Sequence, residues 1–208
     1  LLEVKSESET EQDAIDVSLV TRTGRLFADL KTGADIAGVR GLQSNLGISS
    51  PGVKLHGAGF IVTPDAATAL GLGAVEGLEQ HIRAYRNGRD LADRPRGVFV
   101  IDLFGLEAEE VRRRFPAVYQ WLLERVKPER DAKGHSKDGA GYARLWWLFG
   151  KPRQELRRML DSLPRYVATI EPTKHRIFQF VDAAVLPDNM LIAIADADAY
   201  PLGVLSSR

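Results

Sequence analysis

One short segment of the sequence gathers side chains that could recognise nucleic-acid bases. Residues 169–176 lie between two predicted strands and hold the following polar or charged side chains: Glu171, Thr173, Lys174, His175 and Arg176. A glutamate can accept a hydrogen bond from cytosine N4, lysine and arginine can donate to guanine O6 and N7, and threonine can contact a base edge or a thymine methyl group. The same residues would equally suit a strand-loop-strand hairpin with solvated charges.

Signals of catalysis are missing from the chain. Four histidines are spread along it: His56, His81, His135 and His175. Their spacing has no H-x-H or H-E-x-x-H pattern that would bring two imidazoles to one face. Pro187-Asp188 is not followed by the acid-x-lysine of a metal-dependent nuclease, and no asparagine begins the Asn-Pro-Pro-aromatic motif of an amino-methyltransferase. We therefore assign the chain no catalytic residue, no metal and no cofactor.

The composition is that of a globular protein with a substantial core. Hydrophobic residues make up 44% of the 208, and there is no cysteine. No apolar run approaches the roughly 20 residues that a membrane span requires. The absence of cysteine excludes disulfide scaffolds and thiolate metal sites and fits a reducing cytosol, so we expect a cytoplasmic protein.

Charge is balanced over the chain as a whole but not along it. The 28 Lys/Arg and 28 Asp/Glu cancel, whereas residues 81–160 hold 18 Lys/Arg against 11 Asp/Glu. A local excess of positive charge is typical of a surface that faces phosphates, and it is equally typical of a solvated helix face.

The first half of the chain predicts few regular elements. After an acidic stretch over residues 3–12, Ile15 to Val20 favour a strand, and the glycines of residues 33–59 favour loops and short strands that close on residues 59–62. Thr63-Pro64-Asp65 then supplies a helix cap, a proline at the first helical position and an acid in the first turn. The short helix ends at Gly71 and Gly73, so these glycines are explained by turns and not by a dinucleotide-binding motif.

The middle of the chain mixes strands and helices. Val98 to Leu103 favour a buried strand, and apolar spacing over Glu107–Val126 predicts one kinked helix or two helices interrupted at Pro116. We expect Lys127-Pro128 to end that segment and the polar, glycine-rich residues 131–141 to form a mobile loop. Trp146 and Trp147 could stack on bases, but beside Leu148 and Phe149 they favour the core.

The last third favours strands. A helix over residues 152–160 is followed by predicted strands at residues 166–170, 177–181 and 190–195. The final apolar run with its serines suggests a chain cut just before a helix, and the missing initiator Met suggests a cut at the start as well. Since strands and helices alternate without a βα rhythm, we predict an α+β fold with mixed, mostly antiparallel sheets and several helices.

Several blocks of sequence, in order, resemble one known family. The blocks are Lys54–Pro64, Arg83–Leu91, Val126–Asp131, Trp146–Gly150, Arg165–Phe178, Leu186–Asn189 and Leu202–Arg208. They resemble the region that follows the methylation motifs in fused type IIG, MmeI-like restriction-modification enzymes. The resemblance covers most of the chain and is weakest over residues 1–30, which would only approach the domain.

The resemblance implies a role for the whole chain. It implies that residues 1–208 form a single target recognition domain, a fragment of a larger protein, which reads double-stranded DNA for a fused adenine-N6 methyltransferase and endonuclease. The fragment itself would be no enzyme. The parent would bind S-adenosylmethionine, with Mg²⁺ as a candidate ion for a nuclease part, and its methyltransferase domain would be a partner within the same chain.

The resemblance also sorts the polar residues into two roles. The base contacts are assigned to Glu171, Thr173, Lys174 and His175. Glu171 and Thr173 rank first, because the resemblance implies that this loop varies among family members that recognise different DNA sequences. Phosphate contacts are assigned to Arg83, Arg86, Arg89 and Arg176, which would supply affinity and register but no sequence information. Each arginine could instead form a surface ion pair.

Two interpretations from other classes remain open. One is a protein-interaction module of a large complex that binds no DNA and docks through the basic segment. The other is a free-standing hydrolase, which is disfavoured because no nucleophile and base are paired in the sequence.

Overall fold

The computed structural model describes residues 2–4, 17–19, 23–26 and 40–207. The chain divides into two compact units, residues 1–45 and 46–208, and each is described by itself. Whether they act as the single domain inferred from the sequence stays a prediction.

The first unit contains one strand pair. β1 (Leu2–Val4) pairs antiparallel with β2 (Val17–Leu19), and one turn of 3₁₀ helix, η1, covers Gln43–Asn45. β2 lies inside the strand predicted over residues 15–20. Residues 5–12 of the acidic stretch, Ile15 and Val20 at the ends of that strand, and residues 33–39 of the glycine-rich region lie outside the described residues.

The second unit holds two sheets. The first sheet is antiparallel in the order β3, β10, β7, β8. Its strands cover Ser49–Pro51, Leu191–Ile194, Arg165–Ile170 and Phe178–Asp182. Along β10 the burial alternates, with Leu191 and Ala193 buried and Ile192 and Ile194 half-buried, as expected when one face of a strand covers a core. All three strands predicted for the last third are therefore confirmed.

The second sheet runs in the order β4, β6, β5, β9. Its strands cover Ile61–Val62, Phe99–Ile101, Ile82–Arg86 and Leu186–Pro187. The pairs β4–β6 and β5–β6 are antiparallel, and β5 and β9 are parallel. Because β9 belongs to this sheet and β10 to the first, the turn over residues 188–190 carries the chain from one sheet to the other. The predicted α+β class with mostly antiparallel sheets is confirmed.

Helix α1 (Pro64–Ala69) begins where the sequence predicts. The Thr63 hydroxyl accepts from the amide of Ala66 at 3.2 Å, and Pro64 occupies the first turn, where its missing N–H costs nothing. Gly71 and Gly73 follow with φ of 102° and 83°, a region that favours glycine, so the helix-ending turns are confirmed. Two 3₁₀ turns, η2 (Ala58–Phe60) and η3 (Leu78–Gln80), flank this part of the chain.

Proline also divides the next helical segment. α3 (Ala108–Arg114) and α4 (Pro116–Arg125) are separate helices because Phe115, with φ −131° and ψ 62°, leaves the helical region before the proline. The expectation of a break at Pro116 is confirmed.

The predicted helical segment ends before Lys127-Pro128, as expected: α4 stops at Arg125, with Val126 as its C-cap. Lys127-Pro128 also opens a further helix, α5 (Lys127–Ala132), which was not predicted, since a proline is tolerated in a first turn. The expectation of one loop over residues 131–141 is wrong, because α6 (Lys137–Arg144) begins within them. Its cap is Ser136, whose hydroxyl accepts from the amide of Gly139 at 3.0 Å.

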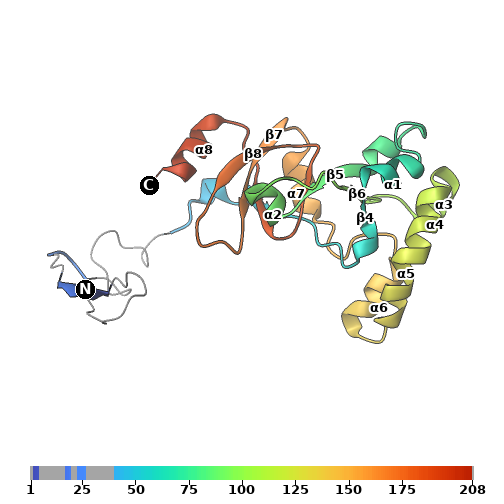
Figure 1. Ribbon diagram of the computed structural model, residues 1–208, viewed down its shortest axis with the longest axis horizontal. Helices are drawn as coiled ribbons and strands as arrows, with labels where there is room; N and C mark the ends of the chain where they lie inside the picture. The colour runs from blue at the N-terminus through green and yellow to red at the C-terminus, as the bar shows by residue number, and fades with distance from the viewer. Residues whose placement is uncertain (1, 5–16, 20–22, 27–39, 208) are drawn as a thin grey trace, which may run out of the picture. The chain divides into compact units, whose positions relative to one another are not determined.

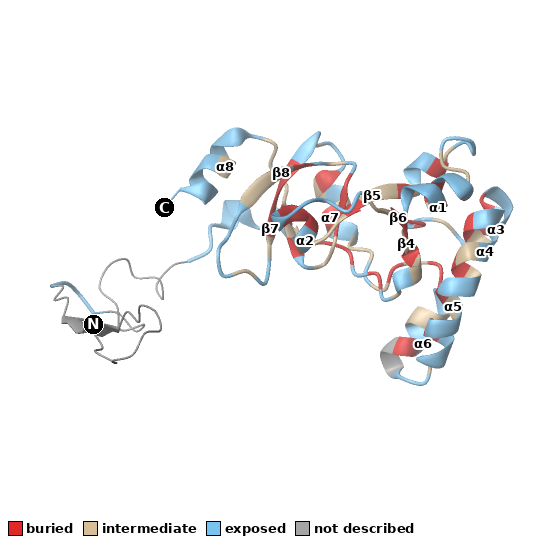
Figure 2. Cartoon of the chain, in the orientation of Figure 1, coloured by how far each residue is buried: buried red, intermediate tan, exposed pale blue. Residues whose placement is uncertain are grey.

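The C-terminal part of the described chain is helical. α7 (Gln154–Leu160) matches the helix predicted over residues 152–160. The last segment is not the approach to a helix but helix α8 (Ala199–Ser206), which starts at Asp198, whose carboxylate accepts from the amide of Tyr200 at 2.8 Å. Figure 2 shows that α8 carries no buried residue. No helix in the described part of the chain is long and apolar enough to cross a membrane.

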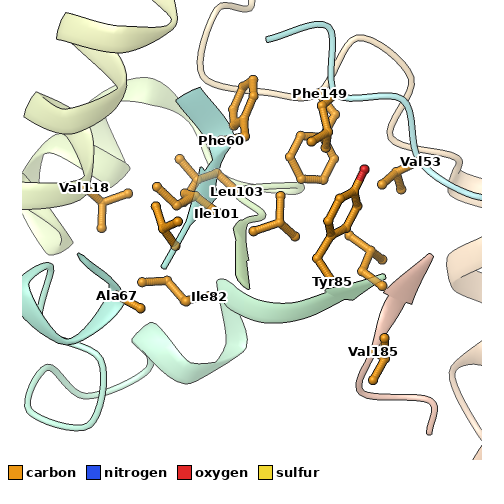
Figure 3. Close-up of a cluster of buried hydrophobic side chains, with 14 of the residues drawn as sticks. Val53, Phe60, Ala67, Ile82, Tyr85, Ile101, Leu103, Val118, Phe149 and Val185 are labelled. Carbon is orange, nitrogen blue, oxygen red and sulfur yellow. The ribbon is translucent and has the colours of Figure 1, made fainter. Parts of the chain in front are cut away.

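One apolar cluster, of which Figure 3 shows some of the side chains, joins the second sheet to α4 and to the segment around Phe149. Figure 1 labels the elements involved, among them β4, β5, β6 and α4. Ile101 and Val118 are fully buried in it, on β6 and α4. Trp146 and Trp147 are each 7% exposed, and the Trp147 indole donates to the carbonyl of Leu106 at 2.9 Å. The tryptophans therefore belong to the core, as the sequence favours.

Gly52 supports the turn between the two sheets. A Cβ at this position would lie 2.2 Å from the carbonyl oxygens of Pro187 and Asp188, closer than atoms can approach. We predict that Gly52→Ala lowers the free energy of unfolding by about 3 kcal/mol, at the upper end for overpacked sites. Gly141→Ala is the control, because its Cβ meets nothing within 4 Å in α6, and it should stabilise by about 0.5–1 kcal/mol. Urea unfolding followed by tryptophan fluorescence measures both, and equal stability of Gly52→Ala and the wild type would contradict the prediction.

Candidate nucleic-acid interface

The predicted base contacts lie on the loop that joins β7 to β8, residues 171–177, which we call the reading loop. Glu171, Lys174 and His175 are exposed, and their side chains make no hydrogen bond or ion pair with the described residues. Thr173 differs: it is half-buried, and its hydroxyl donates to the carbonyl of His175 at 2.9 Å. Three of the four predicted base contacts are thus open to a ligand, while the hydroxyl of the fourth shapes the loop.

The reading loop borders a concave pocket of about 520 Å³, which we call the junction pocket. Its lining comes from three segments that are distant in sequence: Asn87, Gly88, Arg89 and Arg96; Ile170 and Pro172; Asp188 and Met190. An ideal Cβ on Gly88 would lie 3.1 Å from Cγ2 of Ile170, so the glycine permits α2 (Gly88–Ala92) to approach β7 closely. The fold therefore brings together two of the sequence blocks, around Arg89 and around Glu171.

The wall of the pocket at α2 is held by a buried carboxylate. The Asn87 side chain accepts from the amide of Asp90 at 3.1 Å, and Asp90 accepts in return from the amide of Asn87 at 2.9 Å, a reciprocal cap. Arg96 adds two side-chain hydrogen bonds to the same carboxylate, at 2.9 and 2.7 Å. Burial alone would raise the pKa of Asp90, but the hydrogen bonds from Arg96 and from the backbone outweigh it and lower the pKa to about 2.

The opposite wall is fixed by Asp188. Tyr85 on β5 donates its hydroxyl proton to Oδ2 of Asp188, and Oδ1 accepts from the amide of Met190 at 2.9 Å. The amide of Asp188 itself donates to the carbonyl of Arg86 at 2.8 Å. Burial and the neighbouring carboxylate raise the pKa of Tyr85, so the phenol stays a donor. Sequence analysis missed this contact, because only a turn signal marks Asp188 and its partner is 103 residues away.

Arg83 occupies an internal position. Its guanidinium donates to the carbonyls of Ala183 and Ala184, and lies 3.8 Å from the buried carboxylate of Asp102. Asp102 is also held by a bidentate pair from Arg157 at 2.7 and 2.9 Å. Burial lowers the pKa of Arg83, and the attraction of Asp102 offsets part of that effect. The structure thus gives Arg83 a part in tying β5 to the β8–β9 turn, and its assignment as a phosphate contact stays a prediction.

The other three predicted phosphate contacts are more accessible. Arg89 is exposed and lines the junction pocket. Arg86 is half-buried, and like Arg89 it forms no hydrogen bond or ion pair through its side chain within the described residues. Arg176 is exposed and donates to the carbonyl of Ile170 at 3.3 Å, a weak contact that closes the base of the reading loop. Arg176 therefore belongs to the loop that carries the candidate base contacts, and Arg89 lines the pocket that this loop borders.

Acidic and histidine side chains do not gather into a metal-binding group in the described residues. No group of three or more histidine, aspartate or glutamate side chains in them lies close enough to hold a metal ion. The strongly held carboxylates, Asp90, Asp102 and Asp188, are each engaged by arginine, tyrosine or backbone donors. What the site offers is an exposed set of donors and acceptors on a fixed frame.

The fold of the chain is similar to part of a solved enzyme structure. One structure that it resembles is that of the type IIL restriction-modification enzyme MmeI in complex with DNA, with a TM-score of 0.66 and 18% sequence identity over 99% of this chain. The chain spans 26% of the length of that enzyme. At this identity the likeness is one of fold. No protein-family model matches the sequence, and no curated protein matches it.

The Asp90–Arg96 pair predicts a pH-dependent contribution to stability. Because the folded pKa of Asp90, about 2, lies below its ordinary value of 3.8, the carboxylate stabilises the fold above pH 3.8 and this contribution is lost as the pH falls toward 2. We expect Arg96→Ala to lower the free energy of unfolding at neutral pH by about 1–2 kcal/mol, allowing for screening at the half-exposed guanidinium. The difference from the wild type should shrink as the pH is lowered.

Urea unfolding over a pH series measures this effect. Arg94→Ala is the control, because that exposed arginine makes no ion pair with the described residues. A loss of stability in Arg96→Ala that is the same at every pH would show that the pair does not act through the charge of Asp90.

Proposed function

We propose that this chain is a target recognition domain that reads the sequence of double-stranded DNA. One observation carries the proposal: the exposed reading loop holds Arg176 and three side chains without a hydrogen bond or ion pair in the described part of the chain, Glu171, Lys174 and His175, and it borders the pocket that Arg89 lines. Acceptor and donor groups at a groove edge are what direct readout of base pairs requires. The fold shared with a restriction-modification enzyme solved with DNA supports this assignment.

The base contacts and the phosphate contacts have different roles. Glu171, Lys174 and His175 would meet base edges, with Thr173 ordering the loop from within. Arg89 and Arg176, and Arg86 beside them, would bind phosphates and set the register of the domain on the duplex. We place Arg83 last among the phosphate contacts, because its guanidinium is engaged within the protein.

The chain would serve a larger enzyme. We propose a parent of the type IIG kind, in which an S-adenosylmethionine-dependent adenine-N6 methyltransferase domain, joined to a Mg²⁺-dependent nuclease, supplies the chemistry in bacterial defence. Methylation requires the target adenine to leave the base stack, so the recognition domain would hold the flanking sequence in place while the methyltransferase domain receives the flipped base. The chain itself would carry out no reaction.

One observation favours docking on another protein as a second function. Helix α8 is apolar yet exposed, with Tyr200 77% and Val204 55% accessible. An uncovered apolar face is typical of a contact with a partner domain. This face lies on a different element from the reading loop, so DNA readout and docking do not compete for the same residues.

A binding selection separates the two functions. The 208-residue chain is incubated with randomised duplex DNA at low and moderate salt, and retained duplexes are sequenced. Sequence readout predicts one enriched short motif and an affinity that falls steeply with salt, since phosphate contacts release counterions. Retention without a preferred motif would leave docking as the better account.

Reversal of the charge on Glu171 tests the reading loop directly. Glu171→Lys replaces an acceptor by a donor, so we expect the preferred base to change at one position of the motif, with a preference of about tenfold, because one base contact is worth about 1–3 kcal/mol. Folding should be intact, since the Glu171 side chain is exposed and forms no hydrogen bond or ion pair with the described residues. Glu109→Lys on α3 is the charge-reversal control, because its side chain is 83% exposed and its ion pair with Arg112, at 4.0 Å, lies at the surface. An unchanged motif in Glu171→Lys would refute the loop assignment.

A further inference from the structure

Backbone pairing places two lysines that are distant in sequence side by side. Lys54 and Lys151 form an antiparallel bridge in which each backbone amide donates to the other's carbonyl at 3.0 Å. Side chains of residues directly opposed in such a pair project to the same face, with Cβ atoms about 5 Å apart, and like charges there destabilise the pairing. Both lysines are exposed, and neither forms an ion pair with the described residues. No ion pair with the described residues therefore offsets the repulsion between the two ammonium groups.

His56 adds a third nitrogen group to this surface. Its ring stacks on Tyr142 with centroids 4.7 Å apart and planes 23° from parallel. A Cβ on Gly150 would lie 2.2 Å from Cδ2 of His56, so the glycine leaves the space that the imidazole occupies. The backbone of His56 itself has φ of 52°, in the left-handed region that costs a non-glycine residue energy.

The potential at His56 is positive. Partial burial and then the charges of Lys54, Arg130, Lys151 and Lys133 lower the pKa of the imidazole. Of these, Lys133 is neutralised by Glu129 at 2.7 Å. Arg130 is not: it is 3% exposed, and its guanidinium donates only to backbone carbonyls, among them Leu55 at 2.9 Å.

The buried Arg130 lies next to this surface and forms no ion pair with the described residues. Burial lowers the pKa of Arg130 to about 10, although the charge of nearby Glu129 acts in the opposite direction, and the guanidinium stays charged at neutral pH. Its hydrogen bonds to the carbonyls of Tyr142 and Leu145 at 3.3 and 3.0 Å hold the end of α6, and with it the ring on which His56 stacks. Lys54, Lys151 and Arg130 thus all act on His56, and none of the three forms an ion pair within the described part of the chain.

We propose that Lys54, Lys151 and His56 form an oxyanion site that binds a backbone phosphate of DNA. A phosphate between the two ammonium groups would convert their repulsion into two charge-assisted hydrogen bonds, and the imidazole N–H would supply a third donor. Local departures from the rules of stable pairing are expected where a protein binds a ligand.

Continuity with the reading loop favours DNA over a free phosphate ion. Val53, which precedes Lys54, forms a parallel β-bridge with Asp188, and Asp188 lines the junction pocket. Lys54 therefore follows directly on the segment that supports the proposed interface. The inference rests on the proposed function, and it adds a phosphate contact outside all the residues assigned so far.

The test removes the two charges and keeps the aliphatic stems. Binding of the chain to the duplex enriched by the selection is measured by fluorescence anisotropy over a salt series, for the wild type and for Lys54→Met/Lys151→Met. We expect the magnitude of the slope of log K against log salt to fall by about 0.9 for the loss of one phosphate contact, with the sequence preference unchanged. Lys54→Arg/Lys151→Arg should retain the wild-type slope.

Arg112→Met/Arg113→Met on α3 is the charge-matched control, because it removes two exposed cations and should leave the slope as it is. Thermal unfolding in the absence of DNA gives a second readout: the lysine double variant should be more stable than the wild type at low salt, because a like-charge pair has been removed. Pyrophosphate should raise the melting temperature of the wild type and not that of the double variant.

Each outcome decides a different point. If the wild type selects a motif and the double variant keeps its slope, the phosphate site is refuted while DNA readout stands. If the wild type binds no duplex but is stabilised by pyrophosphate through the two lysines, the ligand is a free phosphate and both the proposed function and the DNA assignment of this site fail. If neither probe distinguishes the variants, the lysines bind no anion.

Discussion

The hydrogen bond from Tyr85 to Asp188 is the contact on which the candidate interface depends. Asp188 sits where the chain leaves the second sheet and enters the first, and its amide, its carboxylate and the bridge to Val53 all tie this crossing to other segments. The crossing places β9 beside β5, and direct contacts such as the Gln179 side chain donating to the carbonyl of Leu91 at 2.7 Å hold the hairpin of β7 and β8 against α2. The junction pocket exists because two sheets share this one turn.

The buried carboxylates of the fold are paired with arginines, whereas several exposed cations in the described part of the chain are not paired. Carboxylates inside the fold, Asp90 and Asp102, each receive a bidentate arginine, so their charges are neutralised where they are buried. Within the described residues, the exposed cations on Arg89, Lys54 and Lys151 form no ion pair. The buried pairs set the geometry of the frame, whereas these three cations stay open to solvent at its surface.

Local signals made much of the fold predictable. The cap at Thr63, the break at Pro116 and the strands around the reading loop follow from the residues themselves and their immediate neighbours. α6 could not be found that way, because Asp138, Gly139 and Gly141 have low helix propensity. It is held instead by Arg130, whose guanidinium binds the carbonyls of Tyr142 and Leu145, and a contact of that kind leaves no periodic pattern in the sequence.

The candidate site, too, was predictable only in part from the sequence. The chemistry of the reading loop could be inferred from residue types, since Glu171 and Lys174 stand on a predicted hairpin. Their placement beside Arg89 could not, because it depends on contacts such as that of Tyr85 with Asp188 across 103 positions. For the same reason the sequence could not distinguish Arg83 from Arg86 and Arg89. Only the folded structure shows that Arg83 lies near the buried carboxylate of Asp102.

The way in which the reading loop is anchored has a consequence for its evolution. The amide of Glu171 donates to the carbonyl of Met190 at 2.9 Å, and the amide of Thr173 to the carbonyl of Glu171 at 3.1 Å, so the loop is held at its start by main-chain atoms that every residue type except proline possesses. Side chains at Glu171, Lys174 and His175 can therefore be exchanged with little loss of stability. Selection could vary what this surface recognises while the scaffold beneath it is inherited unchanged.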